Sequence, residues 1–115
     1  MSKNKASDYY LGKEGHNRMN CAQAVICAFK DVFGISEDMI EKFGEYGGGR
    51  APDGLCGAYY AAKNILNDND KCAELESYFL NEAGSIKCRE IRSCRRLSCL
   101  GCVEKSAEFV ENNTL

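Results

Sequence analysis

The sequence predicts an all-α fold, a compact single-domain bundle of about five to six helices over residues 1–115. Its single proline, Pro52, and the placement of its glycines at the ends of apolar segments favour helices punctuated by glycine over a turn-rich β protein. Apolar residues also recur at helical spacing in several segments. A chain of 115 residues can bury about two-thirds of its unfolded surface in one core, and no repeat, linker or low-complexity segment divides it.

The first two helices are expected before residue 35. One covers about residues 3–13 and ends near Gly12 or Gly15. The next begins after Asn20, a suitable N-cap, and runs to about Gly34. Its apolar face repeats at i, i+3, i+4, i+7 and i+11 and consists of Cys21, Ala24, Val25, Ala28 and Val32.

The third and fourth helices flank a glycine-rich loop. Ser36 can cap a helix in SEDMIEKFGEY, where two acidic residues suit the positive end of the helix dipole. The loop GGGRAPDG precedes the fourth helix, which we expect to start near Asp53 or Gly54 and to end at about Asn67. Small residues on this helix would let another helix approach closely: Gly57, Ala58, Ala61 and Ala62.

The remaining helical segments lie after a polar turn. Asn69 or Asp70 caps a helix in KCAELESYFLNEA, which Gly84 closes as a left-handed C-cap. A short helix is expected at residues 87–93, and Ser98 caps the last one. The stripe on that last helix is formed by Cys99, Cys102, Val103, Ser106, Ala107 and Val110, and residues 111–115 are expected to fray.

Composition and charge exclude several partner classes. The net charge of -2 gives no reason to expect nucleic acid or a membrane, and we interpret the basic stretch KCREIRSCRR as a solvated face or as support for a thiolate. The N-terminal segment lacks the apolar stretch of a signal peptide, so we expect a cytoplasmic protein. Structural disulfides are rare in a reducing compartment, and eight cysteines therefore indicate catalysis, redox sensing or metal binding.

Four cysteines fall in the first turn of an expected helix: Cys21, Cys56, Cys88 and Cys99. Unpaired amide groups and the positive dipole end stabilise a thiolate there, so we expect the pKa of these thiols to be lowered. Basic residues on both sides of Cys88 strengthen that expectation for it. Cys99 and Cys102 also form a CxxC, the spacing of dithiol redox centres and of half a zinc site.

The other cysteines and the single histidine carry weaker signals. Cys27 is interpreted as a core residue or a surface thiol, and Cys72 as a core residue. Cys94, in the basic turn, fits either a structural or a chemical role. His16 is expected in a turn, in contact with solvent.

Several stretches carry a resemblance to a known family: NCAQAV at residues 20–25, the GGG loop before Cys56-Gly57-Ala58, CRE at residues 88–90, and a final cysteine before an apolar helix. Over about residues 9–110 the chain resembles the bacterial and archaeal redox-active proteins named for a C-GCAxxG-C-C pattern. The resemblance implies a compact helical fold with a thiol redox role. It places the four defining cysteines on Cys21, Cys56, Cys88 and Cys99.

Two positions depart from the family pattern. Ala61 replaces the last glycine of CGAxxG, a change small enough for close packing to survive. Cys102 competes with Cys99 for the fourth defining position, and the distance to the following Val103 favours Cys99. With both present, this chain can form a CxxC dithiol.

Three functions remain open from the sequence. The first is thiol–disulfide exchange or electron transfer with a partner protein or small molecule, in which Cys56 attacks and Cys21 resolves, with Cys88–Cys99 or Cys99–Cys102 as a second pair. The second is a metal site, zinc or an iron–sulfur cluster, held by Cys21, Cys56, Cys88 and Cys99. The third is a non-catalytic interaction module, or an anion-binding one that uses the loop glycines Gly48, Gly49 and Gly57.

Overall fold

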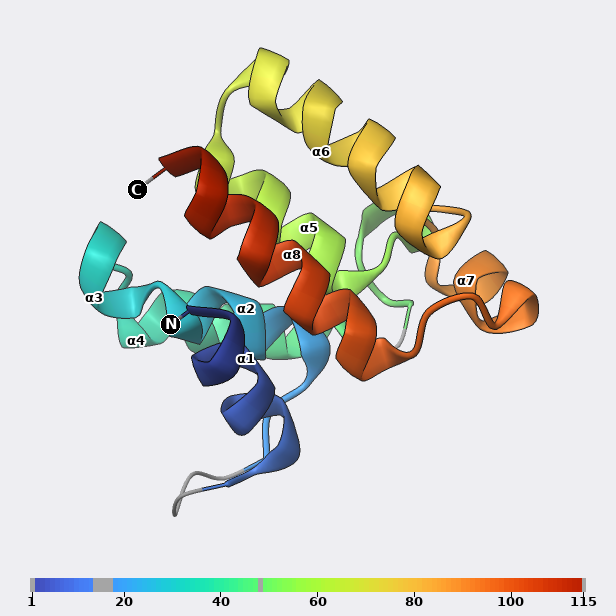
Figure 1. The fold of residues 1–115 in the computed structure, drawn as a ribbon. Coiled ribbons are helices and arrows are strands. Elements are labelled where there is room, and N and C mark those ends of the chain that lie inside the picture. The colour runs from blue at the N-terminus through green and yellow to red at the C-terminus, as the bar shows by residue number, and fades with distance from the viewer. Residues whose placement is uncertain (1, 14–17, 48, 115) are drawn as a thin grey trace.

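The computed structural model describes residues 2–13, 18–47 and 49–114, and within these ranges the chain is all-α, as predicted. Figure 1 shows the arrangement of the helices. They are α1 (Ser2–Leu11), α2 (Cys21–Ala28), α3 (Lys30–Phe33), α4 (Glu37–Lys42), α5 (Gly57–Leu66), α6 (Asn69–Ala83), α7 (Cys88–Cys94) and α8 (Cys99–Thr114), with 3₁₀-helices η1 (Phe43–Tyr46) and η2 (Pro52–Gly54).

The helix count exceeds the expected five to six because the second predicted helix is broken. Phe29 adopts φ -109° and ψ 13°, values outside the helical range, and its ring is fully buried. Chain direction changes there, so α3 leaves the line of α2. Val32, predicted on the buried face, is therefore 51% exposed.

Most helix ends follow the predicted capping residues. The Asn20 side chain accepts from the Gln23 amide in a full capping box, and Ser36 accepts from the Met39 amide. Gly84 closes α6 with φ 86°. The N-cap of α6 is Asp68 rather than Asn69 or Asp70, and its carboxylate accepts from the Lys71 amide at 3.0 Å.

The fourth predicted helix begins later than expected, at Gly57. Asp53 lies in the left-handed region with φ 60°, which an α-helix cannot include. Residues 52–54 form a short 3₁₀ turn instead, and Cys56 becomes the N-cap of α5. Ala61 lies inside α5 and is fully buried, so the missing motif glycine removes no backbone freedom that the fold uses.

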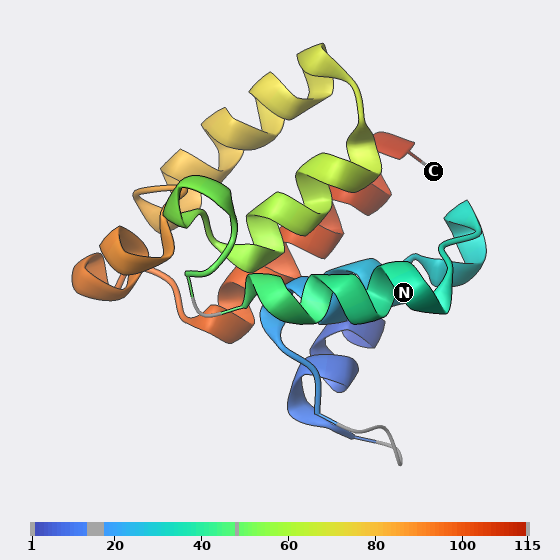
Figure 2. The ribbon, with the colours of Figure 1, turned by 180° about the vertical axis from the view of Figure 1, so that it is seen from behind.

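The core lies where α8 packs against α1, α2 and α5, with α6 along its outer side (Figure 1). Alanines on α2 and α5 are fully buried and let these helices lie close together: Ala22, Ala24, Ala58, Ala61 and Ala62. Figures 1 and 2 both show α7 at one edge of the molecule, where the chain passes from α6 to α8. Of the described helices, none has the length and apolar character needed to cross a membrane.

Candidate thiol site

The four cysteines expected at helix starts all occupy helix starts. Cys21, Cys88 and Cys99 are the first residues of α2, α7 and α8. Cys56 immediately precedes α5 as its N-cap. The predicted positions are thus confirmed, and the local structure around each one explains how four separate helices converge.

Asn20 fixes the start of α2 and with it Cys21. Its Oδ1 accepts a 2.7 Å hydrogen bond from the Gln23 amide, and its Nδ2 donates to the carbonyls of Phe43 and Gly44 at 3.3 and 3.0 Å. One side chain therefore caps the helix and ties it to η1. Cys21 follows directly and is held against the first turn of α5.

Two glycines bring the backbone close to the cysteine sulfurs. A Cβ on Gly57 would lie 2.7 Å from the Cys21 Sγ, so only glycine fits between them. Gly49 has φ +84°, and a Cβ there would lie 3.5 Å from the Cys88 Cβ. Gly49 in the loop therefore packs against Cys88, and Gly57 at the start of α5 packs against Cys21. Gly48 lies outside the described residues.

A short antiparallel contact joins the segments before α5 and α7. The Cys56 amide donates a 2.8 Å hydrogen bond to the Ile86 carbonyl, and Leu55 and Lys87 form an isolated β-bridge. This contact places Cys56 beside the start of α7, where Cys88 lies.

Cys56 lies at the centre of a hydrogen-bonded group of thiols. Its thiol bonds to those of Cys102 and Cys21. The bond to Cys102 favours the protonated form of Cys56, and the bond to Cys21 favours its thiolate form. The side chains of Cys56 and Cys102 are almost fully buried.

The expected lowering of pKa fails at two of the helix starts. The hydrogen bond to Cys102, together with burial, raises the pKa of Cys56 to about 12, although the Cys21 bond acts against the shift. Burial also raises the pKa of Cys88, while the Arg92 guanidinium partly opposes it. Desolvation outweighs the helix terminus at both positions, and the expectation from helix position alone is wrong for them.

Two hydrogen-bond donors converge on the sulfur of Cys99, which is half-buried. The charge of Cys88 and a hydrogen bond to Cys99 raise the pKa of Arg92. Burial raises the pKa of Tyr10, and the charges of Cys99 and Cys21 and a hydrogen bond to Cys99 add to the effect. Both shifts favour the protonated donor, so the Arg92 guanidinium and the Tyr10 hydroxyl donate to the Cys99 Sγ.

A pocket of about 320 Å³ opens beside these groups, between α7 and the start of α8. Three cysteines, two arginines, two apolar side chains and a serine line it: Cys56, Cys88, Cys99, Arg92, Arg95, Ile91, Leu97 and Ser98. A second hollow on the glycine-loop side is lined by Gly49, Gly54, Cys88, Arg89, Arg92 and Ser93. Cys88 thus borders both hollows, and Cys99 borders the first.

The structure brings together the five cysteines that the sequence singled out, because the pocket lining and the thiol hydrogen bonds connect Cys21, Cys56, Cys88, Cys99 and Cys102. The remaining three lie elsewhere. Cys27 is buried, Cys94 is exposed, and Cys72 is partly buried rather than in the core, with its Sγ 3.6 Å from the Lys63 carbonyl. His16 lies outside the described residues.

The described residues provide no preformed metal site. No group of three or more His, Cys, Asp or Glu side chains in this part of the chain is arranged to hold a metal ion. Seven cysteines, at positions 27, 56, 72, 88, 94, 99 and 102, carry free thiols, so within the described ranges no disulfide joins the cluster. The arrangement is that of neighbouring thiols, several of them linked by hydrogen bonds.

Tyr10 is the site residue that sequence reasoning missed. It lies on α1, far in sequence from Cys99, and reaches that residue because α1 packs against α8. The Arg18 guanidinium stacks over the Tyr10 ring at 5.9 Å from its centroid. No motif or spacing in the sequence marks a tyrosine for this role.

Comparison with known proteins agrees with the cysteine pattern. Residues 19–113 match the model of a family described as "Putative redox-active protein (C_GCAxxG_C_C)". No curated protein and no solved structure matches the chain. The matched range contains all eight cysteines and leaves out α1, including Tyr10.

Proposed function

The chain belongs to the C_GCAxxG_C_C family of redox-active proteins, and on that premise we propose that it carries out thiol–disulfide exchange at the pocket between α7 and α8. Cys99 is the attacking thiolate and Cys88 is the resolving thiol. The observation that carries this proposal is the convergence of the Tyr10 hydroxyl and the Arg92 guanidinium on the Cys99 sulfur, at the wall of a pocket that Cys88 also lines.

Cys99 suits the attacking role because its sulfur is accessible and faces positive charge. A guanidinium and a hydroxyl that donate to a sulfur stabilise negative charge on it, and the thiolate is the nucleophile in disulfide exchange. Cys99 is also the first residue of a 16-residue helix, whose positive dipole end acts in the same direction.

Cys56, which the sequence favoured as the attacker, is less suited to that step. It is only 5% exposed, and the hydrogen bond to Cys102 and burial keep its pKa near 12. At neutral pH such a thiol stays protonated. Contacts with Cys21 and Cys102 support a role for Cys56 inside the protein rather than in the first attack on a substrate.

The proposed reaction takes two steps. The Cys99 thiolate attacks one sulfur of a substrate disulfide RS–SR, so that a Cys99–SR bond forms, the S–S bond breaks and RS⁻ leaves. Cys88 then gives its proton to the medium or to the departing thiolate and attacks the Cys99 sulfur, which releases the second RS⁻ and forms the Cys88–Cys99 disulfide. Two protein thiols are oxidised, and one disulfide is reduced to two thiols.

The test uses the reduced full chain under anaerobic conditions. One equivalent of bis(hydroxyethyl) disulfide is added, the remaining thiols are titrated, and the new disulfide is located by peptide mapping. We expect the loss of two thiols per chain and a Cys88–Cys99 peptide. Cys88→Ser should trap the mixed disulfide on Cys99, and Cys99→Ser should leave both thiol loss and trapping absent.

Cys94→Ser provides the matched control, because Cys94 is an exposed thiol at the other end of α7 from Cys88. It should form the same disulfide as the wild type. A Cys99–Cys102 peptide would show that Cys102, and not Cys88, is the resolving thiol. Undiminished thiol loss in Cys99→Ser would overturn the attacking role of Cys99. If no thiol is lost with the wild type, disulfide exchange itself is wrong.

A further inference from the structure

The pocket beside Cys99 is positively charged in a chain whose net charge is -2. Two arginines, Arg92 and Arg95, belong to its lining, and no acidic residue is among the described residues that line it. Nor do these residues include any ion pair between either guanidinium and a carboxylate. The positive charge at the pocket is therefore local, and no carboxylate of the described residues forms an ion pair with it.

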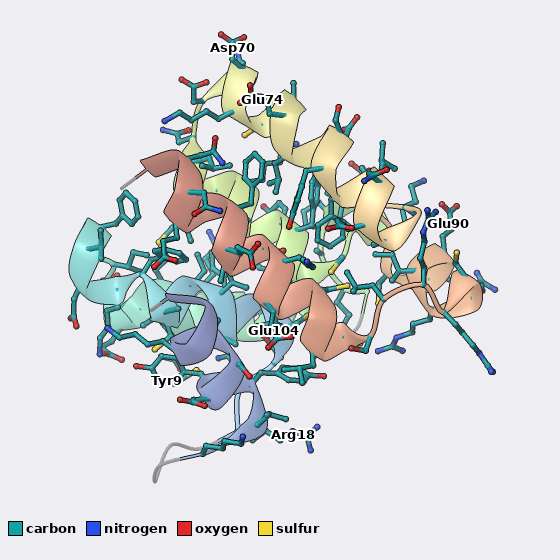
Figure 3. The ribbon with its side chains drawn as sticks, viewed as in Figure 1. Tyr9, Arg18, Asp70, Glu74, Glu90 and Glu104 are labelled. Atoms are coloured by element: carbon teal, nitrogen blue, oxygen red, sulfur yellow. The ribbon has the colours of Figure 1, made fainter. Side chains whose placement is uncertain are left out.

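The acidic side chain on the helix of the two arginines has a partner of its own. Glu90, on the same helix as the arginines, accepts a 2.7 Å hydrogen bond from the Ser85 hydroxyl. Figure 3 shows Asp70 and Glu74 at the start of α6, away from α7, where Glu90 lies. Glu104 lies on α8, the helix that Cys99 begins (Figure 3), but it is not part of the pocket lining, so an anionic ligand would meet the two arginines there.

The two arginines have different surroundings. Arg92 donates to the Cys99 sulfur and interacts with the charge of Cys88, so its guanidinium is already engaged by the reacting groups. Arg95 lines the same pocket, and within the described part of the chain no carboxylate forms an ion pair with it. A planar guanidinium in this position can take a carboxylate in a bidentate contact.

The size and apolar walls of the pocket limit what else the ligand contains. A volume of about 320 Å³ is at the low end for small-molecule sites. Ile91 and Leu97 supply the apolar part of the lining. A short aliphatic chain with a sulfur at one end and a carboxylate at the other would use all three kinds of group: the thiols, the apolar side chains and the arginines.

We propose that the substrate is a small organic disulfide that carries a carboxylate, with Arg95 as the residue that selects it. This inference rests on the exchange reaction proposed above and adds the chemical class of its substrate. The disulfide sulfur meets Cys99, the methylene groups lie along Ile91 and Leu97, and the carboxylate meets Arg95. Arg95 is a specificity residue, and the bonds made and broken are those of the two-step exchange.

The experiment compares three disulfides of similar length and opposite charge. Dithiodipropionate carries two carboxylates, bis(hydroxyethyl) disulfide is neutral, and cystamine carries two ammonium groups. The rate of protein thiol loss is measured for each at neutral pH and low salt, and is divided by the rate for free mercaptoethanol under the same conditions. We expect the normalised rate for the dianion to exceed the neutral rate by about 10-fold, the equivalent of one charge-assisted hydrogen bond.

Variants at Arg95 separate selection from general charge. Arg95→Met should abolish the preference for the dianion, Arg95→Glu should turn it into a preference for cystamine, and Arg95→Lys should retain part of it. Arg96→Met is the matched control, because Arg96 is the adjacent cation and is not part of the described lining. Helix content measured by circular dichroism verifies that each variant is folded.

The possible outcomes test the substrate class, the role of Arg95 and the exchange reaction separately. Equal normalised rates for the three disulfides in the wild type would overturn the substrate class and leave disulfide exchange standing. An equal effect of Arg96→Met and Arg95→Met would show that surface charge, rather than the pocket, selects the anion, and would overturn the role of Arg95. If none of the three reacts, the proposed exchange fails.

Discussion

Gly57 and Cys21 are so close that a single added carbon would not fit between them: a Cβ on Gly57 would lie 2.7 Å from the Cys21 Sγ. The same Cβ would also lie 2.6 Å from the backbone carbonyl oxygen of Tyr46, which cannot rotate away as a side chain can. The first turn of α5 therefore depends on glycine for its contact with α2. Cys21 also hydrogen-bonds to Cys56, the residue before Gly57.

We predict that Gly57→Ala lowers the free energy of unfolding by about 1–3 kcal/mol, the usual cost of an overpacked core position. Urea unfolding followed by circular dichroism measures it. Gly101→Ala is the comparison, because a Cβ there would lie 2.6 and 2.8 Å from the Cδ1 and Cγ of Leu97, a side chain that can shift, and not against backbone. Gly101 lies within α8, where alanine favours the helix, so we expect a smaller loss of stability than for Gly57→Ala. Unchanged stability of Gly57→Ala would contradict the close contact.

Asn20→Ala should cost more stability than the loss of an ordinary helix cap. Asn20 accepts from the Gln23 amide and donates to the carbonyls of Phe43 and Gly44, so three hydrogen bonds disappear together. We expect a loss of about 2–3 kcal/mol. Ser36→Ala, which removes a single 3.2 Å cap bond to the Met39 amide, should cost about 1 kcal/mol. Equal losses in the two variants would show that the bonds to η1 add nothing.

Stability should fall at high pH because of Cys56. The hydrogen bond to Cys102, with burial, raises its pKa from 9.0 to about 12, so the folded state keeps a proton that the unfolded state loses. The stabilisation is complete below about pH 9 and is lost as pH rises toward 12, at up to about 1.4 kcal/mol per pH unit. Cys56→Ala should flatten this slope in urea unfolding measured between these limits, while Cys94→Ala should leave it unchanged. A slope identical in wild type and Cys56→Ala would contradict the buried, protonated thiol.

These contacts also show why some features follow from sequence and others do not. Helix starts at Asn20, Ser36 and Ser98 are local events, decided by a side chain and an amide three residues later. The break at Phe29 is different. It depends on the burial of the Phe29 ring in a core built from helices distant in sequence, and no residue beside it signals a helix end.

The candidate site likewise has features that follow from local sequence and features that depend on tertiary packing. Placing cysteines at helix starts is a local inference that identified four thiols, and the CxxC spacing added Cys102; the fold brings these five together. Their protonation depends on burial and on neighbours from other helices, and this is why the expected lowering of the pKa fails at Cys56 and Cys88. Tyr10 reaches Cys99 from α1 through tertiary packing alone.

Loss of either donor to Cys99 should slow its alkylation. We predict that Tyr10→Phe and Arg92→Met each lower the rate of Cys99 modification by iodoacetamide at neutral pH by about 10-fold, since each removes a hydrogen-bond donor to the reacting sulfur. Peptide mass spectrometry after timed quenching gives the rate for Cys99 alone. Arg89→Met serves as control for charge on α7, because Arg89 borders the second hollow and not the Cys99 pocket. An equal loss in Arg89→Met would assign the effect to overall charge.

Ser106 is a buried polar residue whose hydroxyl makes no hydrogen bond within the described part of the chain. Its side chain is fully buried on α8, and its Oγ has no hydrogen-bond partner among the described residues. A buried hydroxyl without a partner costs about 1–3 kcal/mol, whereas alanine fits the same place without that cost and favours a helix.

We therefore predict that Ser106→Ala raises the free energy of unfolding by about 1 kcal/mol and the melting temperature by a few degrees. Thermal unfolding followed by circular dichroism measures the change. Ser98→Ala gives the opposite sign on the same helix, because the Ser98 hydroxyl accepts a 2.9 Å hydrogen bond from the Gly101 amide and its loss removes the N-cap of α8. Destabilisation by Ser106→Ala would mean that the hydroxyl has a partner in solution, and would make Ser106 a part of the core that alanine cannot replace.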